Sequence, residues 1–199
     1  NTFVVGFVFR NQLRKSVPNL LLGFKKFKQK TKNLHSAKLL LHTHFSEGWD
    51  IPREAKNAGV SMDDILCTYT CRSCKSYFVS NFKGQDQKCP LCGSEKGLVT
   101  ANTQDGVTEA QLNEIYNLMD VYVHPFTSGG QEIPIQEAKL CELITLVTNY
   151  SCGEDLCVSS SGSMPLKWTE YWEPQTHFIK ATTDPDSIAS NLSKVYRMP

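Results

Sequence analysis

Apolar residues along the chain follow two spacings that alternate, and this alternation predicts strands and helices in turn. Short continuous apolar runs are typical of strands buried on both faces, and apolar residues three or four positions apart are typical of helices. The runs predict strands at residues 2–9, 38–43, 64–69, 98–102, 121–124 and 144–148, with an outer strand at 176–180. The helical spacing covers residues 16–29, 52–58, 108–119, 133–142 and 184–196. Strands that alternate with helices predict an α/β fold with a doubly wound parallel sheet.

The composition fits one domain of ordinary size with room for a small insert. The chain has 199 residues, 40% hydrophobic and 21% charged, with a formal net charge of +1. This balance gives no overall field that would hold nucleic acid or an anionic membrane. No apolar run approaches the roughly 20 residues of a membrane-spanning helix, so we expect no membrane span. Because the chain enters a strand-like run directly after Asn1, we expect it to be one domain of a longer protein.

Four of the eight cysteines form two Cys-x-x-Cys pairs, which is the spacing of a metal site. Fourteen residues separate Cys71 and Cys74 from Cys89 and Cys92. Two such pairs offer four thiolates to one tetrahedral ion, and four sulfur ligands leave no open position for chemistry. We therefore predict a structural zinc ribbon at residues 67–97, inserted into the sheet, and no catalytic metal. Metal-binding thiols favour a reducing compartment, so we expect a cytoplasmic protein.

The ribbon also allows a different hypothesis, in which it binds nucleic acid or another protein. Lys75, Lys83, Lys88 and Lys96 give it a basic character. Its aromatic and basic residues are too thinly interleaved to resemble a base-stacking platform. Nucleic acid is therefore the less favoured partner, and a structural role for the zinc is favoured.

A first candidate loop follows the first strand, at the edge of the sheet where doubly wound folds bind ligands. Arg10 and Lys15 lie one strand-to-helix turn apart and could converge on a diphosphate. The planar guanidinium of Arg10 would bind two oxygens at once, and the ammonium of Lys15 would act as a point charge. Gly6 would let the backbone come close to a ligand. The alternative is a solvated basic loop.

A second candidate loop spans residues 127–138 and joins a strand to a helix. Gly129 and Gly130 remove side chains in front of helical N–H groups that can hold phosphate oxygens. Glu137 lies just inside the helix, and its two oxygens suit the adjacent hydroxyls of a ribose. The alternative is an ordinary loop with an acidic residue favoured by the helix dipole.

Together these stretches resemble the C-terminal domain of the retaining GT-B glycosyltransferases of family 4, also called glycosyl transferases group 1. The resemblance rests on VVGFVFRNQLRKSVPNLL, on LNEIYNLMDVYVHPFTSGGQEIPIQEAKLCELITLVTNY and on residues 178–196. It implies the Rossmann-like half of a GT-B fold over residues 1–199, interrupted by the ribbon. It also implies a hexosyltransferase-like enzyme that transfers a sugar from a nucleoside diphosphate sugar, with retention and without a catalytic metal.

The resemblance also implies roles for individual residues. The family's basic pair, which holds the donor diphosphate, falls on Arg10 and Lys15, and its ribose-binding glutamate falls on Glu137. The family's other motif glutamate, which contacts the donor sugar, falls on Gly129 and is missing. Glu132, three positions later, is the candidate to take over that contact. The acceptor site of these enzymes lies mainly in an N-terminal domain that this chain lacks, so we expect donor binding without transfer by this chain alone.

A different doubly wound enzyme, such as a nucleotide-dependent epimerase, is the remaining alternative. The sequence has no GxGxxG motif after the first strand and no Walker loop, which are the phosphate-binding motifs of such enzymes. The glycosyltransferase hypothesis is therefore favoured, with the ribbon as a binding module next.

Overall fold

Six parallel strands form the centre of the main sheet in the computed structural model of the chain, which describes residues 2–31 and 36–198. Their order is β3-β2-β1-β6-β7-β8, and it reverses between β1 and β6. This is the order of a doubly wound dinucleotide-type fold, so the expected fold class is confirmed. The strands are β1 (Phe3–Val8), β2 (Ala37–His42), β3 (Ile65–Cys71), β6 (Val121–His124), β7 (Thr145–Thr148) and β8 (Ser163–Leu166).

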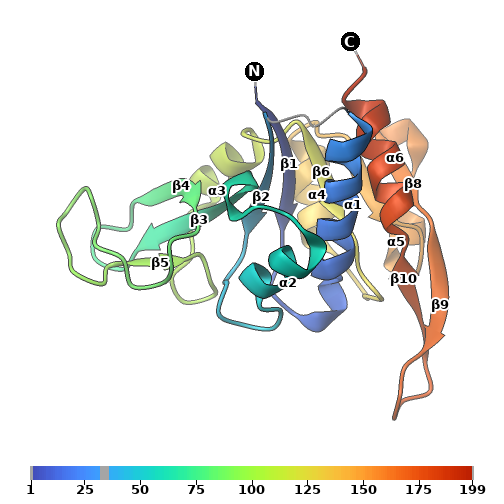
Figure 1. Cartoon of the computed structure of the whole chain (residues 1–199), viewed down its shortest axis with the longest axis horizontal. Helices are drawn as coiled ribbons and strands as arrows, with labels where there is room; N and C mark the ends of the chain where they lie inside the picture. The colour runs from blue at the N-terminus through green and yellow to red at the C-terminus, as the bar shows by residue number, and fades with distance from the viewer. Residues whose placement is uncertain (1, 32–35, 199) are drawn as a thin grey trace.

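Helices cover both faces of this sheet, as Figure 1 shows with α1, α2 and α6 in front and α4 behind. The helix α1 turns Leu20, Leu21, Phe24 and Phe27 into the core, as the spacing predicted. A Cβ at Gly23 would lie 2.6 Å from Ile188, so the missing side chain lets α1 and α6 pack closely. The helices are α1 (Val17–Lys30), α2 (Ile51–Ala58), α3 (Glu109–Tyr116), α4 (Ile133–Leu140), α5 (Cys152–Leu156) and α6 (Pro185–Val195).

The inserted segment shares β3 with the main sheet. The strand β4 (Tyr77–Asn81) pairs antiparallel with β3 on its outer side. The strand β5 (Leu98–Thr100) also pairs antiparallel with β3, whereas the prediction for 98–102 was a strand resuming the parallel sheet. The reason is that the pairing of β2 with β3 ends at Cys67, which leaves residues 69–71 of β3 open to β5 on that side.

A two-stranded hairpin stands outside the main sheet. It consists of β9 (Trp168–Trp172) and β10 (Ile179–Thr183), which pair antiparallel. In Figure 1 it extends from the end of the molecule that carries β8 and α6. The predicted outer strand at 176–180 overlaps β10, but its partner is β9 and not the parallel sheet. Within the described ranges, no helix has the length and apolar character needed to cross a lipid bilayer.

We predict that Gly6→Ala destabilises the fold, because Gly6 lies inside β1 against Met119. A Cβ there would lie 1.9 Å from Met119 Sδ, and Met119 is buried. We expect the free energy of unfolding to fall by about 1–3 kcal/mol, measured by urea denaturation. Gly130→Ala is the matched control, since a Cβ at Gly130 meets nothing within 4 Å. Equal effects of the two substitutions would contradict the packing explanation.

Candidate functional site

Two loops leave the sheet side by side at the point where the strand order reverses. The loop after β1 spans residues 9–16, and the loop after β6 spans residues 125–132. The N–H of Thr127 donates to the carbonyl of Arg14 at 2.8 Å, so the two loops are hydrogen-bonded to each other. Ligands of doubly wound folds bind in the crevice at this point.

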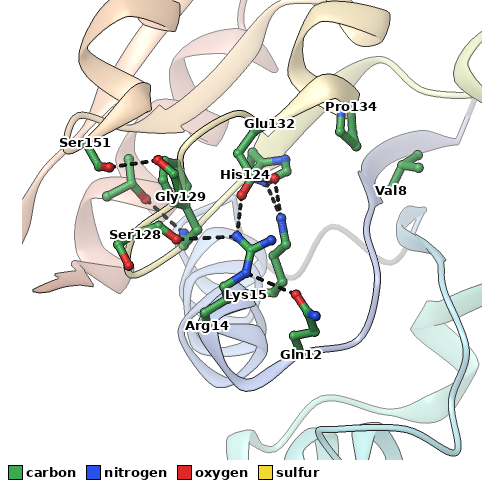
Figure 2. Close-up of polar contacts among 12 residues, drawn as sticks. Val8, Gln12, Arg14, Lys15, His124, Ser128, Gly129, Glu132, Pro134 and Ser151 are labelled. Atoms are coloured by element: carbon green, nitrogen blue, oxygen red, sulfur yellow. Dashed lines mark hydrogen bonds and ion pairs between the residues drawn. The ribbon is translucent and has the colours of Figure 1, made fainter. Parts of the chain in front are cut away.

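A buried ion pair joins the two loops. Lys15 Nζ donates to the carboxylate of Glu132, and each of these residues is 2% exposed. The guanidinium of Arg14 donates to the other oxygen of the same carboxylate and to the carbonyl of Ser128, at 3.3 Å. His124, at the end of β6, is fully buried with Nε2 3.2 Å from Lys15 Nζ. We call these residues, Arg14, Lys15, His124 and Glu132, the switch-point cluster (Figure 2).

The carboxylate of Glu132 stays ionised in this cluster. Burial alone would raise its pKa, but the contacts with His124 and Lys15 outweigh burial and hold the pKa far below its usual range. Burial lowers the pKa of Lys15, and its hydrogen bond to Glu132 opposes that effect. The pair is therefore stabilised as ammonium and carboxylate, each dependent on the other.

Polar groups surround both ring nitrogens of His124. The hydroxyl of Tyr122 lies 3.0 Å from the carbonyl of Val8 and 2.8 Å from His124 Nδ1. The other ring nitrogen, Nε2, lies 3.2 Å from both Lys15 Nζ and Glu132 Oε2, so it accepts from Lys15 in one tautomer of the ring and donates to Glu132 in the other. Burial lowers the pKa of His124 to about 4, which keeps the ring neutral at neutral pH. Two cations and one carboxylate therefore give the cluster a net positive charge suited to an anionic group.

The glycine at position 129 and the glutamate at position 132 depend on each other. A Cβ at Gly129 would lie 2.6 Å from Glu132 Oε1 and 3.3 Å from Arg14 Nη1. Any side chain at position 129 would therefore displace the carboxylate that holds Lys15. Gly130, in contrast, is exposed and has free space around its Cα.

Several residues predicted for the donor site lie outside the cluster. The prediction that Arg10 converges with Lys15 differs from the structure, because the Arg10 side chain is 62% exposed and points to Glu47 at 3.8 Å. Gly6 lies inside β1 against Met119, where packing and not a ligand explains the glycine. Glu137 accepts a hydrogen bond from the buried Tyr116 at 2.8 Å. Lys15, Gly129 and Glu132 are the predicted residues that the structure brings together.

The sequence predictions did not single out Arg14 and left His124 without a role. Arg14 is the direct neighbour of Lys15, and a short 3₁₀ turn at Leu13–Lys15 directs both side chains to Glu132. His124 is the last residue of β6, directly before Pro125. A polar residue at the end of a buried strand is the feature that would have identified it.

A hollow of about 230 Å³ opens on the β1, β2 and β5 side of the cluster. Two buried polar atoms of its wall, His42 Nδ1 and Thr43 Oγ1, have no hydrogen-bond partner among the described residues. Burial lowers the pKa of His42 to about 4, so its ring is neutral and Nδ1 is a donor in one tautomer and an acceptor in the other. Other residues of the wall are Val8, Phe9, Arg10, Asn102 and Pro134. The hollow combines an apolar face with a few polar groups, which is the usual lining of a small-molecule site.

The four cysteines predicted as ligands lie together. Their sulfur atoms are all within 4.8 Å of one another. The Cys71–Cys92 and Cys74–Cys89 sulfur pairs are 3.7 and 3.8 Å apart. A tetrahedron with metal–sulfur bonds of about 2.3 Å has edges of about 3.8 Å, so the distances fit one ion bound by four thiolates.

The two cysteine turns have the same backbone geometry. The N–H of Cys71 donates to Ser76 at 2.9 Å, and the N–H of Cys89 donates to Ser94 at 3.0 Å. Each turn closes through a left-handed residue, Lys75 at φ 59° in the first and Gly93 at φ 73° in the second. The tight turn expected at Gly93 is present, and the pair of turns holds the sulfurs in place.

Comparisons with known proteins show the fold. No profile of a known protein family matches the sequence, and no curated protein sequence matches it. WaaG, a glycosyltransferase involved in lipopolysaccharide biosynthesis, is similar in structure with a TM-score of 0.61 and 12% identity, over 99% of this chain and 38% of WaaG. A structure described as trehalose-6-phosphate from E. coli bound with UDP-2-fluoro glucose is similar with a TM-score of 0.57 and 13% identity, over 100% of this chain and 37% of that one.

A third similar structure is a single domain. It is the C-terminal domain of LpcC, a glycosyl transferase group 1 family protein from Francisella tularensis, with a TM-score of 0.58 and 12% identity, over 98% of this chain and 76% of that one. This chain has the α/β fold of these GT-B glycosyltransferases, and it spans little more than a third of the length of the larger ones.

We predict that Glu132→Gln destabilises the protein by about 3 kcal/mol, because it leaves Lys15 buried without a counter-charge. Urea denaturation would measure the loss. Because the folded-state pKa of Glu132 is lowered, its contribution is full above about pH 4.3 and falls as the pH drops towards the folded-state pKa. Asp186→Asn, in the exposed pair with Lys26, is the control and should change little. A Glu132→Gln variant as stable as this control would contradict the role of the pair.

Proposed function

We propose that this chain is the donor-binding half of a glycosyltransferase that uses a nucleoside diphosphate sugar. The observation that supports it best is the switch-point cluster, in which two neighbouring cations from the loop after β1 meet a carboxylate from the loop after β6 beside an open hollow. The fold shared with GT-B glycosyltransferases is consistent with this function. The remaining part of such an enzyme would bring the acceptor, so we expect no transfer by this chain alone.

The diphosphate of the donor is proposed to bind at Arg14 and Lys15. Arg14 is 38% exposed at its side chain, so its guanidinium can be reached from solvent. The net positive charge of the cluster would offset part of the charge that develops on the leaving diphosphate, without a catalytic metal ion. We propose transfer of a hexose with retention at the anomeric carbon, which the resemblance to family 4 supports.

The nucleoside is proposed to occupy the hollow of about 230 Å³. A base there would give partners to His42 Nδ1 and Thr43 Oγ1, whose burial without partners is otherwise costly. Glu137, one turn into α4, remains the proposed ribose contact, and Arg10 lines the hollow within reach of the nucleotide. Glu132 is proposed to position Lys15 and not to contact the sugar directly.

A zinc ion is proposed for the four-cysteine site, with a structural role. Four thiolates at tetrahedral spacing match zinc well and leave no position open for a substrate. All eight cysteines of the chain are free of disulfides, which suits the reducing cytoplasm that we propose as its location. Charges within the insert are partly neutralised, since Lys88 pairs with Glu95 and Arg72 pairs with Asp86 and Asp105. This pairing makes a nucleic-acid surface the weaker hypothesis.

We predict that one of UDP, GDP and ADP binds the chain saturably in isothermal titration calorimetry. Arg14→Ala should raise its Kd about tenfold or more, because a charge-assisted hydrogen bond to phosphate is lost. Arg53→Ala is the matched control, since Arg53 is exposed on α2 and lines neither hollow, and it should change Kd by about twofold at most. Arg10→Ala tests the phosphate position that the family pattern gives.

Two outcomes would change this proposal. A large loss of nucleotide affinity in Arg10→Ala with none in Arg14→Ala would indicate that Arg10 binds the phosphate, as the family pattern implies. Absence of binding to all three nucleotides by the folded, metal-loaded chain would contradict the proposal. Salt-dependent binding of DNA or RNA that Cys89→Ser abolishes would then favour the ribbon hypothesis.

We predict one zinc ion per chain by inductively coupled plasma mass spectrometry. Cys89→Ser should lose the ion and lower the melting temperature, because a ligand of the tetrahedral site is removed. Cys141→Ser is the control, since Cys141 is half-buried outside the cluster and should leave the zinc content unchanged. Equal zinc content in all three proteins would contradict a zinc site at the four cysteines.

A further inference from the structure

A second hollow adjoins the switch-point cluster, on the side of Arg14 that faces the β9–β10 hairpin. Its volume is about 490 Å³, within the range of roughly 300–1,000 Å³ found for ligand sites. One wall is the start of α1 with the loop that carries Trp49, and the other wall is the hairpin. The residues that matter below are Arg14, Trp49, Thr127, Tyr171, Glu173 and Lys180.

The hairpin is fixed to the site and is not a free arm. The N–H of Ala181 donates to the carbonyl of Thr127 at 2.9 Å, and Thr127 in turn donates to Arg14. At the base of the hairpin, Thr183 Oγ1 lies 2.7 Å from Thr148 Oγ1, and Asn19 donates to the carbonyl of Thr183 at 2.6 Å. These contacts hold the base of the hairpin against both site loops, so the hairpin forms a wall of the hollow.

The lining of this hollow combines aromatic faces with charged and polar groups. Trp49 is half-buried, and its Nε1 donates to the carbonyl of Leu13 at 3.0 Å, which fixes the indole. Tyr171 is half-buried on the hairpin side. Lys180 Nζ donates to Glu173 Oε1 at 2.6 Å, so the pair offers donors and acceptors side by side. An apolar ligand would leave the remaining donors of Lys180 and acceptors of Glu173 without partners, whereas a ligand with many hydroxyls would not.

A pyranose ring matches this chemistry. Its C–H groups carry partial positive charge and pack against the negative face of an aromatic ring, while its hydroxyls need donors and acceptors around the rim. Figure 2 places Val8 and Pro134, which line the nucleoside hollow, on one side of the cluster and Ser128 on the other. The second hollow is lined by Arg14, so it adjoins the proposed diphosphate position, and it shares no described lining residue with the nucleoside hollow.

We propose that the hollow between the start of α1 and the β9–β10 hairpin is a hexopyranose subsite, with Tyr171 and Trp49 as its stacking residues. This inference rests on the proposed glycosyltransferase function. The sugar is either that of the donor or that of the acceptor, since both have the chemistry that the lining recognises.

The test is saturation-transfer NMR on the full chain with methyl α-D-glucopyranoside, methyl α-D-mannopyranoside, methyl β-D-galactopyranoside and methyl N-acetyl-β-D-glucosaminide. We expect transfer to at least one glycoside and a Kd raised about tenfold in Tyr171→Ala. Tyr171→Phe should keep binding, because the ring remains. Trp172→Ala is the matched control, since Trp172 is the next residue of β9 and points to the opposite face of the hairpin.

Three results would overturn the subsite: no transfer to any glycoside, unchanged binding in Tyr171→Ala, or an equal loss in Trp172→Ala.

The source of the sugar follows from two further titrations. If the hollow holds the donor sugar, the nucleoside diphosphate glucose should bind more tightly than the nucleotide alone, and Tyr171→Ala should remove this difference in affinity. If the hollow holds the acceptor sugar, glycoside binding should persist when the nucleoside diphosphate glucose saturates the chain. Nucleotide binding without any sugar binding would leave the proposed function standing and this inference refuted.

Discussion

A lysine buried against a glutamate between the two halves of the sheet is the interaction on which the rest of the site depends. Taking an ion out of water costs several kcal/mol, and only a close counter-charge offsets that cost. Lys15 and Glu132 are each 2% exposed and 117 positions apart in the sequence, so they meet only if β1 and β6 are neighbours. A buried pair is weak evidence for high stability, but it is a strict condition on geometry. The pair forms only when β1 and β6 are neighbours and the two loops lie side by side, and its carboxylate also holds the side chain of Arg14.

The sequence predicted the centre of the fold well because the centre is apolar. β1, β2, β6 and the inner face of α1 are continuous or regularly spaced hydrophobic positions that have few other possible structures. The strands that were not predicted lie at the edges, where this pattern fades. β8 has four residues and includes Pro165, and every residue of β4 is half-buried. In the site, spacing located Lys15 but not Arg14, because the direction of a side chain depends on the 3₁₀ turn that no spacing rule reveals.

The insert and the proposed nucleoside site share structure. Cys71 is the last residue of β3 and also one of the four clustered cysteines. Its strand neighbour β5 leads directly into Ala101, Asn102 and Thr103, which line the hollow of about 230 Å³. The hydroxyl of Thr100 also accepts from the N–H of Phe45 at 3.0 Å, in the loop after β2. The cysteine cluster therefore supports one wall of this hollow through β3 and β5. The β9–β10 hairpin forms a wall of the second hollow, next to Arg14.

The close approach between positions 129 and 132 has an evolutionary consequence. With Gly129, the carboxylate of Glu132 fits within 2.6 Å of where a Cβ would stand, and it neutralises a buried lysine. A glutamate gained at position 129 would clash with the one at 132, and loss of the one at 132 alone would leave the lysine uncompensated. Each single step therefore passes through a less stable protein, and the two positions are epistatic. Related sequences are expected to carry the acidic residue at one of these positions or the other, with the exchange made only in lineages that had stability to spare.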